Sequence, residues 1–180
     1  MEVIARQGIA SLTVAGIAEQ CGVSSGLLHY HFATKDKLLR AAAGRLATER
    51  AQARVGEFRG RGIAALDGFW RHIEQAVARS SEQAWLDVVL LSRDDPVIAA
   101  EIARARAFEW QALGRRLPEL FAELGAAPPA PVEEIAVAIL AFFDGVALGL
   151  AAGAPRDALK SAYDAFWLAL IASGQSGARR

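Results

Sequence analysis

The order of apolar and polar positions along this chain predicts helices almost throughout. Val, Ile and Thr nowhere alternate with polar residues as they do in half-buried strands. We expect helices near residues 14–20, 25–31, 35–54, 63–79, 82–93, 96–124, 132–152 and 156–173, after the end of an earlier helix at residues 1–6. The last residues, SGQSGARR, should be disordered. The chain is therefore predicted to be all-α.

Capping and turn residues mark where these helices begin and end. Thr13, Ser24 or Ser25, and Thr34 can each accept a backbone N–H at a helix start. Pro96 suits a first helical turn, whereas a proline at position 118 can kink a helix. GEFRGRG at residues 56–62 is a loosened basic connection, and AAPPAP at residues 126–131 is a stiff linker.

The stretch from residue 13 to 37, TVAGIAEQCGVSSGLLHYHFATKDK, predicts two short helices around a glycine turn and the start of a longer helix. Ala18 is the small residue where the short helices cross, and Gly22 suits a sharp turn with positive φ. Apolar residues that would lock the pair are Ile17, Cys21, Val23 and Leu28. This layout indicates a helix-turn-helix that reads DNA, with Cys21 as core filler rather than a reactive thiol.

Composition changes this picture only in part. Hydrophobic residues make up 53% of the 180 residues, so the chain can bury a sizeable core, and the net charge is zero. Residues 1–61 carry nine Lys or Arg against five acids, a net +4 that leaves −4 for the rest. That asymmetry favours an N-terminal partner that is a polyanion, although ordinary scatter could give it too. A single cysteine excludes an internal disulfide or a cysteine-based metal cluster and fits the cytoplasm.

Other function classes find little support. We expect no cofactor or metal, and no enzyme, since the chain lacks a P-loop, G-x-S-x-G, H-E-x-x-H and a nucleophile–base pair. Residues 135–154 are the most apolar stretch, but Asp144 and two bracketing prolines favour a buried helix over a membrane span. No signal peptide opens the sequence, and we expect no membrane partner.

The segment Gly-Val-Ser-x-Gly-x-Leu-x-x-x-Phe-x-x-Lys-x-x-Leu, from Gly22 to Leu38, resembles the tetracycline-repressor (TetR) family of bacterial transcription regulators. The specific resemblance covers residues 1–45. It implies a three-helix DNA-binding head at residues 1–45 and a helical effector-binding and dimerisation domain at residues 46–180. It also implies a first helix that begins upstream of Met1, so we expect part of that helix to be missing here.

Carried over by position, the resemblance implies a double-stranded DNA operator as partner. The residues expected to contact it are Thr13, Ser24, Ser25, Gly26, Leu27, His29, Tyr30, His31 and Lys35. Ser25, Leu27 and His29 depart from the common pattern, so direct base contacts should be sparse. Leu27 could pack on a thymine methyl, and His29 could donate to phosphate or a purine N7. The alternative is that His29 and His31 are surface histidines without a role.

The second domain is expected to pair two copies of the chain. Glycines recur every four residues at Gly145, Gly149 and Gly153, a smooth ridge that would let another helix approach. The residues expected at a homodimer interface are Phe142, Phe143, Gly145, Gly149, Tyr163, Phe166, Trp167 and Leu170. Their alternative place is the core of a single chain.

A small apolar or aromatic effector is the remaining expected partner. Candidate pocket residues are Trp70, Trp85, Phe108, Trp110 and Asp144, with ordinary core as the alternative for each aromatic residue. Asp144 could instead be satisfied by a neighbouring helix. The chain is thus predicted to be a homodimeric regulator, most often a repressor in this family, released from its operator by the effector. The second candidate is a carrier of lipids or hydrophobic ligands with a vestigial head.

Overall fold

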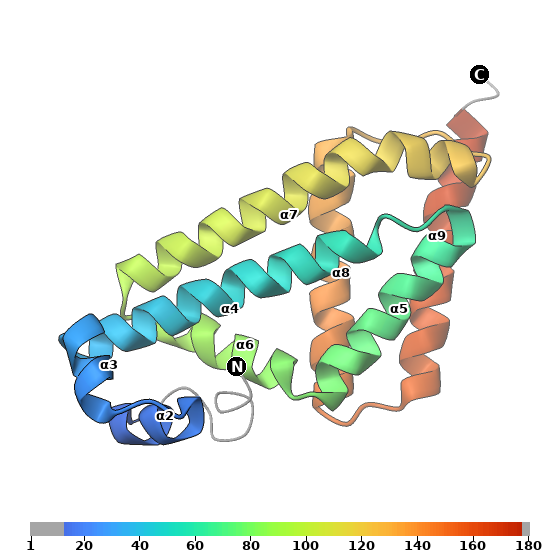
Figure 1. Cartoon of the computed structure of the whole chain (residues 1–180). Coiled ribbons are helices and arrows are strands. Elements are labelled where there is room, and N and C mark those ends of the chain that lie inside the picture. The colour runs from blue at the N-terminus through green and yellow to red at the C-terminus, as the bar shows by residue number, and fades with distance from the viewer. Residues whose placement is uncertain (1–12, 178–180) are drawn as a thin grey trace. The chain divides into compact units, whose positions relative to one another are not determined.

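The computed structural model describes residues 13–177, which form helices joined by turns and short linkers (Figure 1). The helices are α2 (Val14–Cys21), α3 (Ser25–His31), α4 (Lys35–Glu57), α5 (Gly62–Ala78), α6 (Ser81–Leu91), α7 (Pro96–Glu123), α8 (Val132–Ala151) and α9 (Arg156–Gly177). No strand occurs within these residues, and the all-α prediction is confirmed. The helix expected at residues 1–6 lies outside the described residues.

The end of α9 corrects one expectation. Residues 174–177 were predicted to be part of a disordered tail, but the helix continues to Gly177. Gly174 is buried, and a side chain at this position would collide with the carbonyl oxygen of Ala127 in the linker. A glycine therefore lets the helix pack directly on the linker backbone.

The described chain divides into two compact units. Unit 1 comprises residues 1–50 and 79–105, and unit 2 comprises residues 51–78 and 106–180. Both α4 and α7 therefore contribute residues to each unit. The boundary predicted at residue 45 separates a DNA-binding part from an effector-binding part by function. The two compact units do not test that division, and it stays a prediction.

Unit 1 is held together by an apolar layer and two ion pairs. Leu46, Trp85 and Val88 are buried, and the Arg50 guanidinium lies 4.6 Å from the centroid of the Trp85 ring. Arg50 also makes a two-point contact with Glu82, at 3.0 and 3.3 Å. Since both charged side chains are largely buried, this pairing satisfies groups that would otherwise be costly to bury.

A second ion pair in unit 1 fixes the start of α7. Arg40 on α4 donates to Asp95 at 2.7 Å, and Asp95 accepts the backbone N–H groups of Val97 and Ile98 at 3.0 and 3.4 Å. The Arg40 hydrogen bond, opposed by partial burial, holds the pKa of Asp95 below its usual value. One carboxylate thus caps α7 and ties it to α4.

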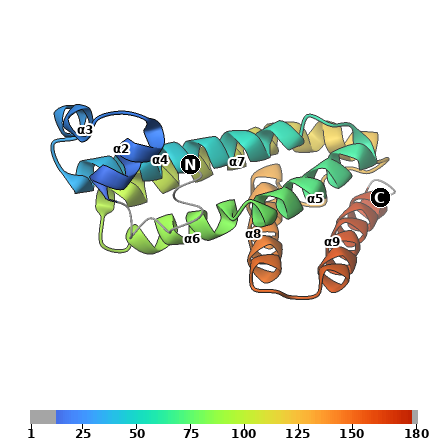
Figure 2. The same cartoon turned by 60° about the horizontal axis from the view of Figure 1, so that its bottom comes forward.

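Unit 2 is built around stacked aromatic rings. Phe69 of α5 lies between Phe58 and Phe143, with ring centroids 4.6 and 4.2 Å away. Tyr163 of α9 is 1% exposed and donates its hydroxyl hydrogen to the Leu66 carbonyl oxygen at 2.8 Å. Burial of that hydroxyl raises the pKa of Tyr163. The stack joins α5, α8 and α9, which lie beside one another in two views (Figures 1 and 2).

Four charged side chains meet inside unit 2. Arg54 of α4 contacts Asp144 of α8 at 2.8 Å and Glu109 of α7 at 3.6 Å. Arg106 of α7 contacts Glu109 at 3.2 Å and Asp144 at 2.5 Å. These residues, which we call the ion quartet, have no formal net charge. Asp144 is therefore held by neighbouring helices, the structural alternative that the sequence left open.

Candidate nucleic-acid interface and ligand cavity

The turn between α2 and α3 has the geometry that the sequence predicted. Gly22 adopts a left-handed conformation with φ 64° and ψ 27°, and the N–H of Val23 donates to the Ala18 carbonyl at 3.0 Å. Ala18 is 2% exposed, as expected of the small residue at a helix crossing. The side chain of Cys21 lies outside the described residues, so its expected packing stays a prediction.

Three local hydrogen bonds set the starts of the helices. Gly16 N–H donates to Thr13 Oγ1 at 3.1 Å, Leu27 N–H to Ser24 Oγ at 3.2 Å, and Lys37 N–H to Thr34 Oγ1 at 3.2 Å. Each hydroxyl satisfies a backbone donor that the helix itself leaves unpaired. The predicted caps Thr13, Ser24 and Thr34 are confirmed, with Ser24 rather than Ser25 capping α3.

The side of α3 away from α2 is open to solvent. Leu28 is half-buried, whereas Leu27 is 45% and Tyr30 83% exposed. All nine residues predicted to contact DNA are exposed: Thr13, Ser24, Ser25, Gly26, Leu27, His29, Tyr30, His31 and Lys35. Thr13 Oγ1 accepts a backbone N–H and still has its own hydroxyl hydrogen to donate to a phosphate. Their exposure places them where DNA could reach them, while the contacts themselves stay a prediction.

The four predicted effector residues of unit 2 do not gather at one site, and the fifth, Trp85, belongs to the other unit. Trp85 belongs to unit 1, where it stacks under Arg50. Within unit 2, Trp70 is buried 5.3 Å from the Tyr163 ring, and Asp144 belongs to the ion quartet. Phe108 is 43% exposed. Of the five residues, Trp110 is the one that lines the cavity described next.

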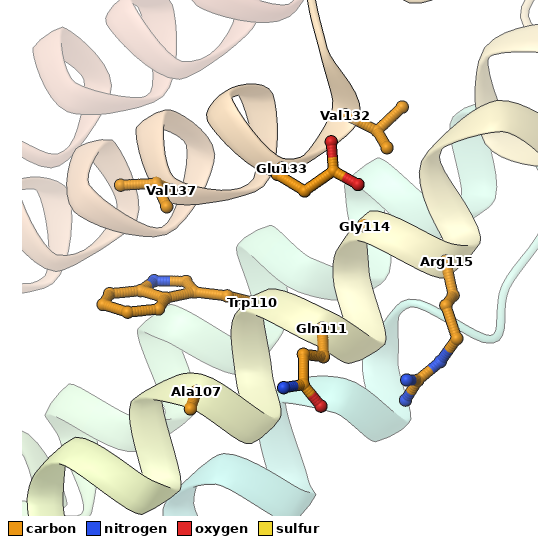
Figure 3. Close-up of a pocket in the computed structure, with 8 residues that line it drawn as sticks. All are labelled: Ala107, Trp110, Gln111, Gly114, Arg115, Val132, Glu133 and Val137. Carbon is orange, nitrogen blue, oxygen red and sulfur yellow. The ribbon is translucent and has the colours of Figure 1, made fainter.

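A cavity of ≈ 550 Å³ lies between α7 and α8 within unit 2 (Figure 3). Its lining residues are Ala107, Trp110, Gln111, Gly114, Arg115, Val132, Glu133 and Val137. Apart from Trp110, sequence reasoning missed this set. A glycine in the middle of a predicted helix, at position 114, was the one available signal, because the other residues are ordinary on a helix surface.

The predicted dimer residues fall into two groups. Phe143, Tyr163 and Trp167 are at most 3% exposed and belong to the chain's own core, so they cannot face a partner directly. Gly149 packs on Leu159 of the same chain, since a Cβ there would lie 3.1 Å from Leu159 Cδ1. Phe142, Phe166 and Leu170 are half-buried, and Gly145 is exposed with open space around it. Gly153 lies beyond the end of α8, so the glycine ridge is shorter than expected.

Helix α8 is apolar on both sides. It is long and apolar enough to pass as a membrane span, with a mean hydropathy of 2.0, yet seven of its residues lie in the core of unit 2. Its opposite side carries exposed small or apolar residues, as does the outer side of α9. We call this set the α8–α9 surface: Ala138, Ala141, Gly145, Leu148, Ala165, Leu168 and Ala169.

Comparisons with known proteins agree on both the head and the fold. Residues 1–42 match the family model described as bacterial regulatory proteins, tetR family. No curated protein sequence matches the chain significantly. Similar solved structures include a TetR-family transcriptional regulator from Rhodococcus sp., with 23% identity, a TM-score of 0.71 and coverage of 93% of this chain and 92% of that one.

Two further structures have the same fold. GusR of Salmonella enterica is 19% identical, with a TM-score of 0.70 and coverage of 94% of this chain and 90% of that one. A transcriptional regulator from Saccharomonospora viridis, solved in complex with choline, is 23% identical, with a TM-score of 0.67 and coverage of 92% and 89%. At such identities the similarity to these structures shows a shared fold, and the match to the family model is confined to residues 1–42.

Proposed function

We propose that the chain is a DNA-binding transcriptional regulator of the TetR family, a homodimeric repressor released from its operator by a small molecule. The family match over residues 1–42 and the shared fold support this proposal. The observation that carries the proposal is α3: a helix with no buried residue, capped by Ser24 and set against α2 by a left-handed glycine. Such a helix is built to present its outer side to a partner.

We infer that this head positions itself mainly through phosphates. Tyr30, His31 and Lys35 are exposed donors at the end of α3 and the start of α4, and Thr13 offers a hydroxyl at the other end of the head. Phosphate contacts fix register but carry no sequence information. Base selection would depend on Leu27 and His29 and on the preceding small residues Ser25 and Gly26. Because these offer few base contacts, the spacing between the two heads would carry much of the specificity.

The α8–α9 surface supports the homodimer. A helix that is apolar all round is normally covered all round, and the core covers only one side of α8. Alanine and glycine on the other side allow a second helix to come close. A second copy supplies such a helix, and a two-fold pair of heads can span half-sites about 34–36 Å apart.

Release by an effector needs a route from the ligand to the head. Helix α4 begins directly after the head and ends at Glu57 in unit 2, so ligand-induced changes in unit 2 would bear on the helix that carries the head. A coupling of about 1–3 kcal/mol is enough for a 5- to 150-fold change in DNA affinity. The choline-bound structure from Saccharomonospora viridis supports a small-molecule effector in this fold.

An electrophoretic mobility-shift assay on DNA upstream of the native gene tests the assigned DNA contacts. His31→Ala and Lys35→Ala should each weaken binding, and loss of the Lys35 contact from both heads of the dimer should reduce the slope of log K against log salt by about 2. Arg71→Ala removes an exposed positive charge from α5 and should leave binding unchanged. Unaltered binding by the His31→Ala/Lys35→Ala double variant would remove these two residues from the interface.

Sedimentation of the purified chain tests the homodimer. Gly145→Arg should yield monomers, because a Cβ at Gly145 meets nothing within 4 Å in the single chain but would stand in the path of a partner. Gly56→Arg is the matched control, since Gly56 is also helical with open space around it. A dimeric Gly145→Arg protein would place the interface elsewhere. Failure of the native chain to bind any DNA at low salt, with lipid copurifying, would instead favour the carrier function.

A further inference from the structure

The cavity between α7 and α8 has an apolar wall on which a small hydrocarbon body could lie. Trp110 is 39% and Val137 43% exposed, and both face the cavity together with Ala107 and Val132 (Figure 3). Large apolar side chains left half-open to water around one hollow are typical of ligand sites. The volume of ≈ 550 Å³ falls within the usual range of such sites, about 300–1,000 Å³.

The polar side of the same cavity carries two opposite charges from two different helices. Glu133 stands in the first turn of α8, while Arg115 and the amide of Gln111 belong to α7. Among the described residues, neither Glu133 nor Arg115 has an ion-pair partner. Most other arginines of unit 2 are paired, including Arg54, Arg106 and Arg116. The cavity therefore offers one carboxylate and one guanidinium that the fold does not use.

Gly114 adds space to the cavity at a cost to its helix. A glycine in a helix interior destabilises it by about 1 kcal/mol relative to alanine. A Cβ at Gly114 would lie 4.0 Å from the Val132 carbonyl oxygen, an ordinary contact, so packing does not require glycine here. The missing methyl group leaves volume in the cavity wall.

We propose that this cavity binds a small zwitterion with an apolar body, its ammonium end at Glu133 and its carboxylate end at Arg115 and Gln111. The apolar body lies on Trp110 and Val137. Only the idea that this ligand is the effector rests on the proposed function. Binding of the zwitterion to the cavity does not depend on DNA. A zwitterion can pair with both Glu133 and Arg115, whereas a simple cation leaves Arg115 without a counter-charge and a simple anion leaves Glu133 without one. Charge complementarity therefore favours a zwitterion.

Isothermal titration calorimetry on the full chain at low ionic strength tests the proposal with 4-(aminomethyl)benzoate as the probe. Benzylamine and 4-methylbenzoate are its half-charged relatives, with the same ring and one charge removed. The zwitterion should bind about two- to fivefold more tightly than either relative, which is the range for an exposed ion pair. Equal affinity for the three compounds, or no heat from the zwitterion at concentrations up to about 10 mM, would overturn the proposal.

A charge exchange separates recognition from mere surface charge. Glu133→Arg and Arg115→Glu, made singly, should each lower the affinity for the zwitterion toward that of a half-charged relative. The double variant should restore it to within about twofold, because a zwitterion can bind with its ends reversed. Loss of binding in the double variant, with an unchanged melting temperature, would refute the assignment of the two ends.

Gly114→Ala distinguishes weaker ligand binding from a loss of folding. This variant should raise the stability of the chain while weakening the zwitterion, because the added methyl fills part of the cavity. Unchanged affinity in this more stable variant would show that the ligand lies elsewhere. A mobility-shift assay with and without the probe then separates the two proposals. A chain that binds the zwitterion but no DNA would support the ligand site and contradict the repressor function. A chain that binds DNA but no zwitterion would support the repressor function and contradict the ligand site.

Discussion

Removal of Arg54 from the ion quartet should destabilise the chain strongly. Arg54→Met keeps most of the side-chain stem but removes the charge that contacts Asp144 at 2.8 Å and Glu109 at 3.6 Å. Arg106 is then left with two carboxylates, and the formal charge of the quartet falls from zero to −1. Because the Arg54 and Glu109 side chains are 4% and 2% exposed, water can do little to screen that excess charge.

The expected magnitude follows from this burial. Breaking a buried ion pair by removing one partner costs about 3–5 kcal/mol, a large share of the roughly 5–15 kcal/mol that stabilises a typical domain. For a chain of this size, each kcal/mol lowers the melting temperature by about 2–4 °C, so a fall of about 6–20 °C is expected. The loss should be smaller in Arg54→Met/Glu109→Gln, which returns the quartet to zero charge.

Thermal unfolding followed by circular dichroism, at one fixed protein concentration, measures these differences. Arg45→Met is the matched control on the same helix, since Arg45 and its partner Glu49 are 75% and 41% exposed and such pairs contribute about 0–1 kcal/mol. A melting temperature for Arg54→Met within 2 °C of the control would refute the reasoning. So would strict additivity of the Arg54 and Glu109 substitutions, because residues of one network should couple by about 0.5–3 kcal/mol.

Three further substitutions test local features. Gly22→Ala should destabilise the head by about 1–2 kcal/mol through its left-handed φ alone, measured as lost hydrogen-exchange protection in α2 and α3; unchanged protection would contradict the turn geometry. Asp95→Asn keeps the cap on α7 but loses the charge beside Arg40. Since the folded pKa of Asp95 is depressed, the wild-type advantage should be full above about pH 5 and vanish as the pH falls through that depressed pKa; an advantage that does not change with pH would exclude this titration. Tyr163→Phe removes a hydrogen bond to the Leu66 carbonyl, which also accepts a bond within α5, and should lower the free energy of unfolding by about 0.5–1.5 kcal/mol in chemical denaturation; a more stable variant would contradict this contribution.

The head was predictable because its determinants are local. Thr13, Ser24 and Thr34 each cap a helix by accepting an N–H three residues along the chain, and Gly22 sets its turn by its own φ. Interactions at that separation are encoded in short sequence patterns. The helices of the rest of the chain were predictable for the same reason, to within a few residues at each end.

The cavity and the core were not predictable in this way, because they depend on which side of each helix faces which neighbour. Trp70 and Trp110 are both tryptophans in predicted helices, yet Trp70 packs on Tyr163 and Trp110 opens into the cavity. Glu133 and Arg115 lie on different helices with a proline-rich linker between them. Their meeting at one hollow follows from how α7 packs on α8, and no pattern within either helix contains that information.

Helix α3 contains no lysine, arginine or acid. If α3 reads DNA, non-specific attraction to the DNA backbone would come from Lys35 and the other cations outside α3. Loss of those cations would weaken binding to all sequences alike, whereas changes within α3 would alter the preferred sequence with little effect on the salt dependence. The neutrality of α3 would thus assign to separate segments how firmly the protein holds DNA and which DNA it prefers.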